Sequence, residues 1–197
     1  MKKYLVIIMS IIITLSIISC TVQPNNPNEP SGAYYFHFAS DLESWVITSW
    51  GGVSDGFVTA AYNGDPAFSA DGTTGSAEIA CAFGTTETST SSVKWFMRTI
   101  TKTDMANRLI GARIYIPSDM ASLNPGYSAT FAIHTTDGYM LQTSKTLDQT
   151  GWNYYYTTIT AGTALESSDS VSIIVAKSLS YTADWSGNIY IDEVYWR

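Results

Sequence analysis

The sequence contains few cysteines, few histidines and few basic residues. It has 2 cysteines and 2 histidines, and 10 lysines and arginines stand against 17 acidic residues, giving a net charge of −7. So few cysteines provide no disulfide framework, and a zinc site needs clustered cysteine and histidine. Nucleic acids and anionic lipid surfaces both require basic patches on their partners. We therefore expect no nucleic-acid partner and no attachment to a membrane through surface charge.

The start of the chain, residues 1–19, has the pattern of an export signal. Lys2 and Lys3 precede the apolar residues 4–18, a run too short and wrongly flanked for a comfortable membrane span. A serine and then Cys20 follow, an order that resembles the lipobox of bacterial lipoproteins, where the cysteine is lipidated. The alternative is an ordinary secretion signal with a chance cysteine. The lipobox predicts an exported protein anchored at the cell membrane or outer membrane only through acyl chains on Cys20.

Behind the signal, the composition predicts a tether and then one folded domain. Residues 20–32 hold half of the chain's 6 prolines among asparagines, a composition typical of an extended linker. Residues 33–197 are long enough for one hydrophobic core, and we expect this domain to be a monomer. Cys81, the cysteine that remains after lipidation, lies in an apolar pattern and is interpreted as an inert core residue.

Alternation of apolar and other residues predicts β-strands throughout the domain, and only residues 118–123 suggest a short helical turn. Five runs show this spacing, at residues 77–83, 110–116, 127–134, 152–158 and 171–175. Glycine, proline, asparagine and aspartate separate them as turn signals. Eight to ten short strands at such intervals predict an all-β fold, an antiparallel β-sandwich or jelly roll.

The sequence offers no convincing catalytic site. A glycosidase, for example, needs two carboxylates that converge across a cleft. Asp192 and Glu193 are neighbours on a predicted strand, so we expect them on opposite faces of the sheet. His134 is interpreted as a surface or groove residue hydrogen-bonded to a neighbour. We predict a protein that binds without catalysing a reaction.

Aromatic residues are numerous and provide the candidate binding site. A sugar ring has apolar C–H faces, so exposed tryptophan and tyrosine rings can serve as platforms, with polar side chains binding the hydroxyl groups. Trp45 and Trp152 fit core positions. Four aromatics lie beside glycine, polar loop or turn residues and are candidate platforms: Trp50, Trp95, Tyr139 and Trp185. Partial burial in the core is the alternative for each of them.

Four short motifs together resemble the jelly-roll carbohydrate-binding modules, and within these the mannan-binding family 27 is the nearest. The motifs are Phe36-His37-Phe38 before Leu42-Glu43-Ser44-Trp45, the turn at residues 71–77, the strand at residues 112–117 ending in proline, and the closing strand at residues 187–194. They extend over essentially the whole domain. The resemblance implies a jelly roll whose platform aromatics fall on Trp50, Trp95 and Tyr139.

The same resemblance implies a structural calcium ion. The closing-strand aspartate of these modules contributes to it, which places Asp192 at the site, and Asp71 in the turn is a second candidate ligand. Many relatives carry an acidic residue near the first Phe-x-Phe, where this chain has His37 and Ala39, with Asp41 slightly later. Ordinary turn aspartates are the alternative for Asp71 and Asp41.

The sequence therefore predicts a surface lipoprotein that binds a polysaccharide or oligosaccharide, with β-mannan or β-glucan as candidates. Two alternatives remain open. One is a structural or adhesion lipoprotein without glycan specificity, and the other is a jelly-roll polysaccharide lyase or hydrolase.

Overall fold

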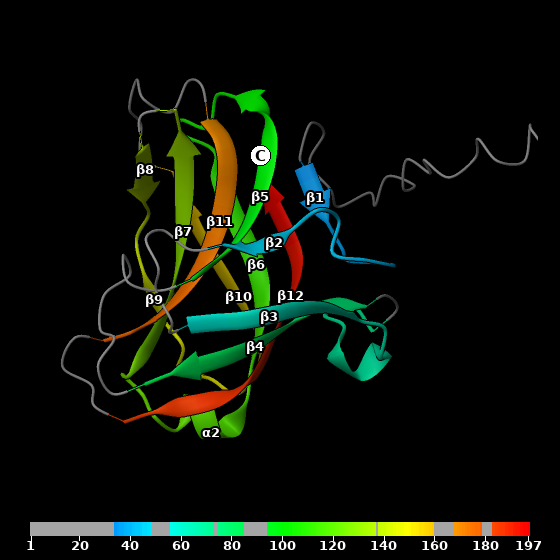
Figure 1. Ribbon diagram of the computed structural model, residues 1–197, viewed down its shortest axis with the longest axis vertical. Helices are drawn as coiled ribbons and strands as arrows, with labels where there is room; N and C mark the ends of the chain where they lie inside the picture. The colour runs from blue at the N-terminus through cyan, green and yellow to red at the C-terminus, as the bar shows by residue number, and fades with distance from the viewer. Residues whose placement is uncertain are drawn as a thin grey trace, which may run out of the picture. The chain divides into compact units, whose positions relative to one another are not determined.

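The computed structural model describes residues 34–48, 56–72, 75–84, 94–136, 138–159, 168–178 and 183–197. Within these ranges, the compact unit Ala33–Arg197 contains two antiparallel six-stranded sheets, which form the predicted sandwich (Figure 1). The predicted signal, Cys20 and the tether lie outside the described residues. None of the helices in the described part is long and apolar enough to cross a membrane.

The first sheet, called sheet A here, has the strand order β10-β6-β12-β4-β3. These strands are β10 (Gly151–Thr158), β6 (Leu109–Ile116), β12 (Trp185–Trp196), β4 (Ser76–Phe83) and β3 (Gly56–Asn63). The short strand β1 (Tyr34–Phe36) also pairs with the C-terminal end of β12. The predicted closing strand is thus a central strand, between β6 and β4.

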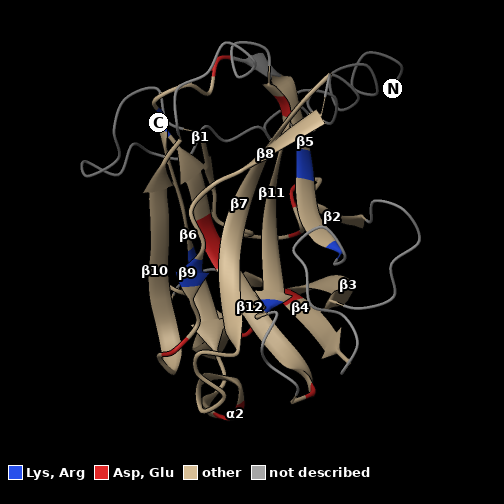
Figure 2. Ribbon diagram, turned by 90° about the vertical axis from the view of Figure 1, so that its left-hand side faces the viewer, with Lys and Arg blue, Asp and Glu red and all other residues tan. Residues whose placement is uncertain are grey.

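The second sheet, sheet B, has the order β2-β5-β11-β7-β8. These strands are β2 (Val46–Thr48), β5 (Trp95–Thr103), β11 (Ser168–Lys177), β7 (Tyr127–Thr135) and β8 (Gly138–Leu141). A two-residue strand, β9 (Lys145–Thr146), pairs with the start of β7. Figure 2 views this sheet with β7 and β11 in front.

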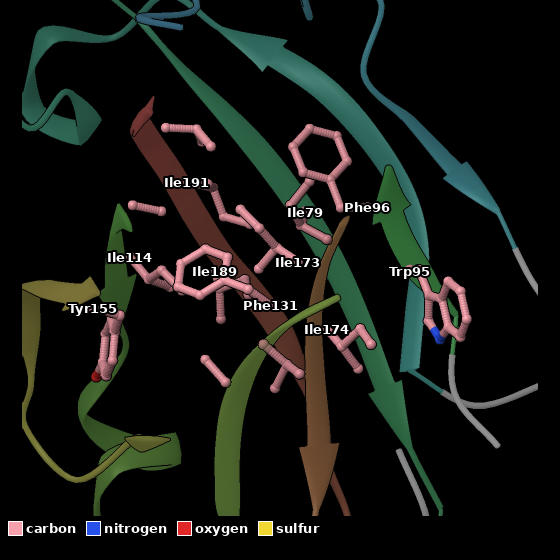
Figure 3. Packing of buried hydrophobic residues seen from close by; sticks show 14 of the residues in the cluster. Ile79, Trp95, Phe96, Ile114, Phe131, Tyr155, Ile173, Ile174, Ile189 and Ile191 are labelled. Atoms are coloured by element: carbon pink, nitrogen blue, oxygen red, sulfur yellow. The ribbon is translucent and has the colours of Figure 1, made fainter. Parts of the chain in front are cut away.

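The core lies between the sheets and follows the predicted alternation. Ile79 of β4, Ile114 of β6 and Ile189 of β12 are fully buried from sheet A, and Phe131 and Ile173 are buried from sheet B (Figure 3). Burial of each such side chain stabilises the fold by roughly 1.5–3 kcal/mol. The core is therefore the expected two-layer packing of inward-facing residues.

The predicted helical turn is also present. The helix α2 (Ser118–Ala121) begins after Pro117, and the side chain of its residue Met120 is buried. A single 3-10 turn, η1 (Pro66–Phe68), follows β3, and the Asp65 side chain accepts a hydrogen bond from the Ala67 N–H at its start. Cys81 is buried as predicted, and burial raises the pKa of its thiol.

Two predicted features of individual strands are wrong. Trp185 was assigned to a loop, but it is the first residue of β12. Asp192 and Glu193 do not point to opposite faces, because the β6–β12 register shifts between Asp192 and Tyr195 and Glu193 has a φ of 47°. Such a bulge redirects side chains and breaks the simple alternation on which the prediction relied.

Candidate functional site

The outer face of sheet B carries a row of aromatic and polar side chains. His134 of β7 pairs with Tyr139 of β8 on one side and with Ser170 of β11 on the other. Cross-strand partners project from the same face of a sheet. Trp95 begins β5, next to β11 in the sheet. The sheet register therefore assembles residues that are far apart in the sequence.

The aromatic rings in this row contact one another directly. The Trp95 ring centroid lies 4.8 Å from that of Tyr139 in an edge-on arrangement and 4.8 Å from that of His134. Edge-to-face packing of this kind fixes ring orientation. Trp95 and Tyr139, two of the predicted platform residues, thus belong to one cluster. Trp50, the third, lies outside the described residues.

A pocket of about 250 Å³ opens beside this cluster. Its lining combines the Trp95 and His134 rings with the Asp169 carboxylate and the hydroxyl groups of residues on three strands. The lining hydroxyl residues are Thr48, Thr135 and Ser170. An apolar floor with a few convergent polar groups is the usual composition of a ligand pocket. Ligand hydroxyl groups would find both donors and acceptors here.

His134 is held in place and uncharged at neutral pH. Its Nε2 lies 2.8 Å from the Ser172 hydroxyl, across the β7–β11 pair. Burial lowers the pKa of His134 more than the nearby Asp169 carboxylate raises it. Asp169 in turn accepts a hydrogen bond from the Ser170 hydroxyl at 2.8 Å. The pocket therefore presents a neutral imidazole and an oriented carboxylate.

This face is more buried than the sequence suggested. Trp95 is 1% exposed, so the prediction that it stands out as an open platform is wrong, and only its contact with the pocket is available to a ligand. Ala132 and Ser172 on the same face are fully buried. The alternation pattern missed this because β7 and β11 are buried on both faces. Tyr139 is half-buried and remains the more accessible ring.

Trp185 belongs to a different part of the fold. Its ring packs on Phe83 and Tyr127, and its indole N–H donates to the Asp119 carboxylate at 3.1 Å. Tyr127 stands seven residues before His134 on β7, which corresponds to roughly 23 Å along the strand. Trp185 is 6% exposed. The structure does not bring it together with Trp95 and Tyr139.

The predicted calcium ligands fall into two separate places. Asp192 is fully buried on β12 with Asp71 nearby, and burial raises its pKa to about 7 despite hydrogen bonds from the Ala70 and Glu193 N–H groups. Asp41 instead accepts a hydrogen bond from the Glu43 N–H. Asp41 also lies near Arg98. Burial lowers the pKa of Arg98, and the carboxylates of Glu43 and Asp41 offset part of that lowering.

The residues around Asp192 fit a calcium ion poorly. Arg113, its cross-strand partner, binds Glu193 at 2.5 Å and donates to the Ala70 carbonyl at 3.2 Å. Both Asp192 oxygens already accept backbone N–H groups. Among the described residues, no three acidic, histidine or cysteine side chains are grouped closely enough to hold a metal ion. The cation at this point of β12 is the Arg113 guanidinium, which is bound to Glu193 and not to Asp192.

Sequence reasoning missed part of the pocket. Asp169 and Ser170 lie at the irregular start of β11, where the register shifts, and no spacing pattern marks them. His134 was interpreted as a surface or groove residue bonded to a neighbour, and it was not included among the predicted binding residues. The sequence feature that could have indicated a pocket at His134 is its position within a pair of strands rich in serine and threonine.

No protein-family model matches the sequence, and no curated protein matches it. Solved structures do match in fold. The xylan-binding module CBM15 is 11% identical with a TM-score of 0.54, covering 83% of this chain and 94% of that one. A second similar structure comes from work on the promiscuous specificity of carbohydrate-binding modules of the β-sandwich superfamily. It is 16% identical with a TM-score of 0.56, and the match covers 82% of this chain and 60% of that one.

A third similar structure has a different role. The K1 cleaved adhesin domain of Lys-gingipain from Porphyromonas gingivalis W83 is 11% identical with a TM-score of 0.51, covering 84% of this chain and 97% of that one. At these identities the likeness shows the fold alone. The chain is an all-β jelly-roll sandwich with the architecture of these modules.

Proposed function

We propose that the protein binds polysaccharide without catalysing its cleavage, through the outer face of sheet B. The observation that carries the proposal is the pocket in which the Trp95 and His134 rings, with Tyr139 packed against Trp95, adjoin the Asp169 carboxylate and several hydroxyl groups. Such a set offers an apolar surface for a sugar ring and partners for its hydroxyl groups. The similarity to carbohydrate-binding modules of the same fold supports this reading.

The ligand we propose is a neutral β-linked polysaccharide. β-Mannan and β-glucan are the candidates from the sequence, and xylan joins them because a similar module binds it. The net charge of −7 disfavours acidic polymers, which a protein of the same sign repels. Cys20 would hold the domain at the cell surface through its acyl chains, with residues 20–32 as a tether.

The carboxylates support binding over hydrolysis. A glycosidase places two carboxyl groups across a cleft within reach of the substrate. Asp192 is fully buried and Glu193 is bound to Arg113, so this pair does not face a cleft. Among the residues that the structure describes, Asp169 is the one acidic side chain that lines the pocket beside Trp95.

A glycan array probed with the full-length chain tests the proposal. We expect binding to neutral β-linked glycans with no release of reducing sugar from the same polymers. Binding to no glycan would favour an adhesion protein, for which the gingipain adhesin domain is a precedent in fold. Release of reducing sugar would identify an enzyme instead.

A further inference from the structure

A second groove lies at the edge of sheet A, away from the Trp95 pocket. It has a volume of about 470 Å³ and runs between β10 and the segment that follows β9. Figure 2 shows β9 and β10 on the left-hand side of the view, far from β5. The side chains that matter here are Lys145, Asp148, Gln149, Asn153, Tyr154 and Tyr156.

The tyrosines of this groove are unusually exposed. Tyr154 is 48% exposed and Tyr156 is 52% exposed, and their ring centroids are 5.2 Å apart. Alternate residues of a strand share one face, so both rings stand on the outer face of sheet A. Tyr155, between them, turns toward the core and is 7% exposed. Two large adjacent rings are therefore left without a protein partner over much of their surface.

A third tyrosine, Tyr195, packs against one ring of this pair. Tyr195 of β12 stacks on Tyr154 with ring planes 13° apart and centroids 6.0 Å apart. The strand between them carries Gly111, where an added Cβ would come within 2.8 Å of the Tyr195 hydroxyl. The missing side chain at Gly111 is what allows the Tyr195 ring to lie across β6. The exposed rings are thus fixed in orientation.

The polar wall of the groove is also fixed. The Asn153 amide donates to the Gln149 carbonyl at 2.6 Å and to the Gly151 carbonyl at 2.9 Å, which holds the turn before β10. Burial and the neighbouring Asp148 carboxylate raise the pKa of Tyr155 to about 12, so its hydroxyl remains a donor. Donors and acceptors therefore stand at set positions along the β10 side of the groove.

We infer that this groove is a second binding site for a neutral polysaccharide chain. Exposed rings suit the apolar faces of sugars, and an amide, an ammonium and a carboxylate suit their hydroxyl groups. One Lys145 charge and one Asp148 charge balance, so no charged ligand is favoured. The volume falls within the roughly 300–1,000 Å³ of ligand pockets. The site rests on the ligand class of the proposed function, and it lies where β10 of sheet A faces β9 of sheet B, apart from the Trp95 pocket.

A second copy of the chain is the competing occupant. Within the described residues β10 pairs with β6 alone, and an open strand edge can pair with another chain. Two glycan sites on one domain instead predict tighter binding to long polymers than to short oligosaccharides, because the second contact becomes intramolecular. These two occupants give different results in the test below.

The test compares full-length variants by calorimetry with cello-, manno- and xylohexaose. The variants are the double change Tyr154→Ala/Tyr156→Ala, the single change Tyr139→Ala, the triple combination, and Val58→Ala as an exposed control. We expect two hexasaccharides per chain for the parent and the control, and one at the parent affinity for the double variant. The single variant should keep the groove site and weaken the sheet B site by roughly 30-fold or more, and the triple should show both losses. On the long polymer, loss of the groove should weaken binding by about 10²-fold or more.

Each other result is decisive. A double variant that matches the parent in stoichiometry and in polymer affinity overturns the second site and leaves the proposed function intact. Full loss of binding in that variant while Tyr139→Ala matches the parent confirms the groove and refutes the sheet B site. A parent that binds no hexasaccharide refutes both. A parent that sediments as a dimer and becomes monomeric in the double variant assigns the edge to a second copy.

Discussion

Arg113 stands directly opposite Asp192 in the β6–β12 ladder, and its guanidinium joins Glu193 to the Ala70 carbonyl. This arrangement holds the 65–72 segment against the outer face of sheet A, since the Ala70 N–H donates to Asp192 at 2.9 Å. A side chain therefore makes the link between the closing strand and the preceding turn.

Calcium should not affect the stability of the protein. Since a ligand stabilises a fold only by binding it, the melting temperature should be equal in millimolar calcium and in chelator. Arg113→Met should lower it, because the bonds of Arg113 to Glu193 and to the Ala70 carbonyl are lost. Arg108→Met removes an exposed bond to the Asp104 carbonyl and should have a small effect. Thermal unfolding measures both. A chelator-dependent drop would restore the calcium site.

Protonation of His134 should cost stability in mild acid, in opposition to Asp192, whose raised pKa of about 7 lets the folded chain bind a proton there more readily than the unfolded chain. Burial lowers the pKa of His134 below the ordinary value of 6.5, so the unfolded chain binds a proton there that the folded chain does not. Above pH 6.5 His134 is neutral in both states and costs no stability. As the pH falls below 6.5, the unfolded chain takes up the proton first, and the folded state loses stability relative to it. In urea titrations from pH 8 to pH 5, the stability of the parent relative to His134→Gln should fall, because both chains share the contribution of Asp192. Equal slopes would show that His134 is not the titrating group.

Gly111 should tolerate no side chain. In Gly111→Ala the new Cβ meets the Tyr195 ring at under 3 Å, and overpacking of this kind costs about 1–3 kcal/mol. Denaturant unfolding of the variant measures the cost. Combining it with Tyr195→Ala removes the clash, so the two changes together should destabilise by less than their sum. Strict additivity would mean that the ring lies elsewhere.

The sequence predicted the layers of the fold better than the residues of the site. Period-two spacing places Ile79, Ile114 and Ile173 in the core because inward-facing residues repeat along a strand. It did not reveal that Trp95 is buried, since exposure depends on which strands become neighbours. Local irregularity removed other signals, as at the bulge that brings Glu193 to Arg113. Long-range pairing and bulges are properties of the assembled sheet.

The lipid anchor is tested by partition. Cys20 lies outside the described residues, so its role remains the prediction made from the lipobox. The parent should enter the detergent phase, and Cys20→Ala should remain in the aqueous phase because the acyl chains are lost. Cys81→Ala is the matched control, since that cysteine is buried in the core. Equal partition of the parent and Cys20→Ala would leave an ordinary secretion signal.

The most direct test of polysaccharide binding at sheet B is calorimetry of Tyr139→Ala on the glycan that the array selects. If the ligand binds at the outer face of sheet B, the variant should lose about 2 kcal/mol or more of binding free energy, a roughly 30-fold rise in Kd at that site. The reason is that Tyr139 packs on Trp95 beside the pocket. The affinity should change little with salt, since stacking on a neutral sugar forms no ion pair. A variant that folds like the parent and keeps the parent affinity at every site would contradict polysaccharide binding at sheet B.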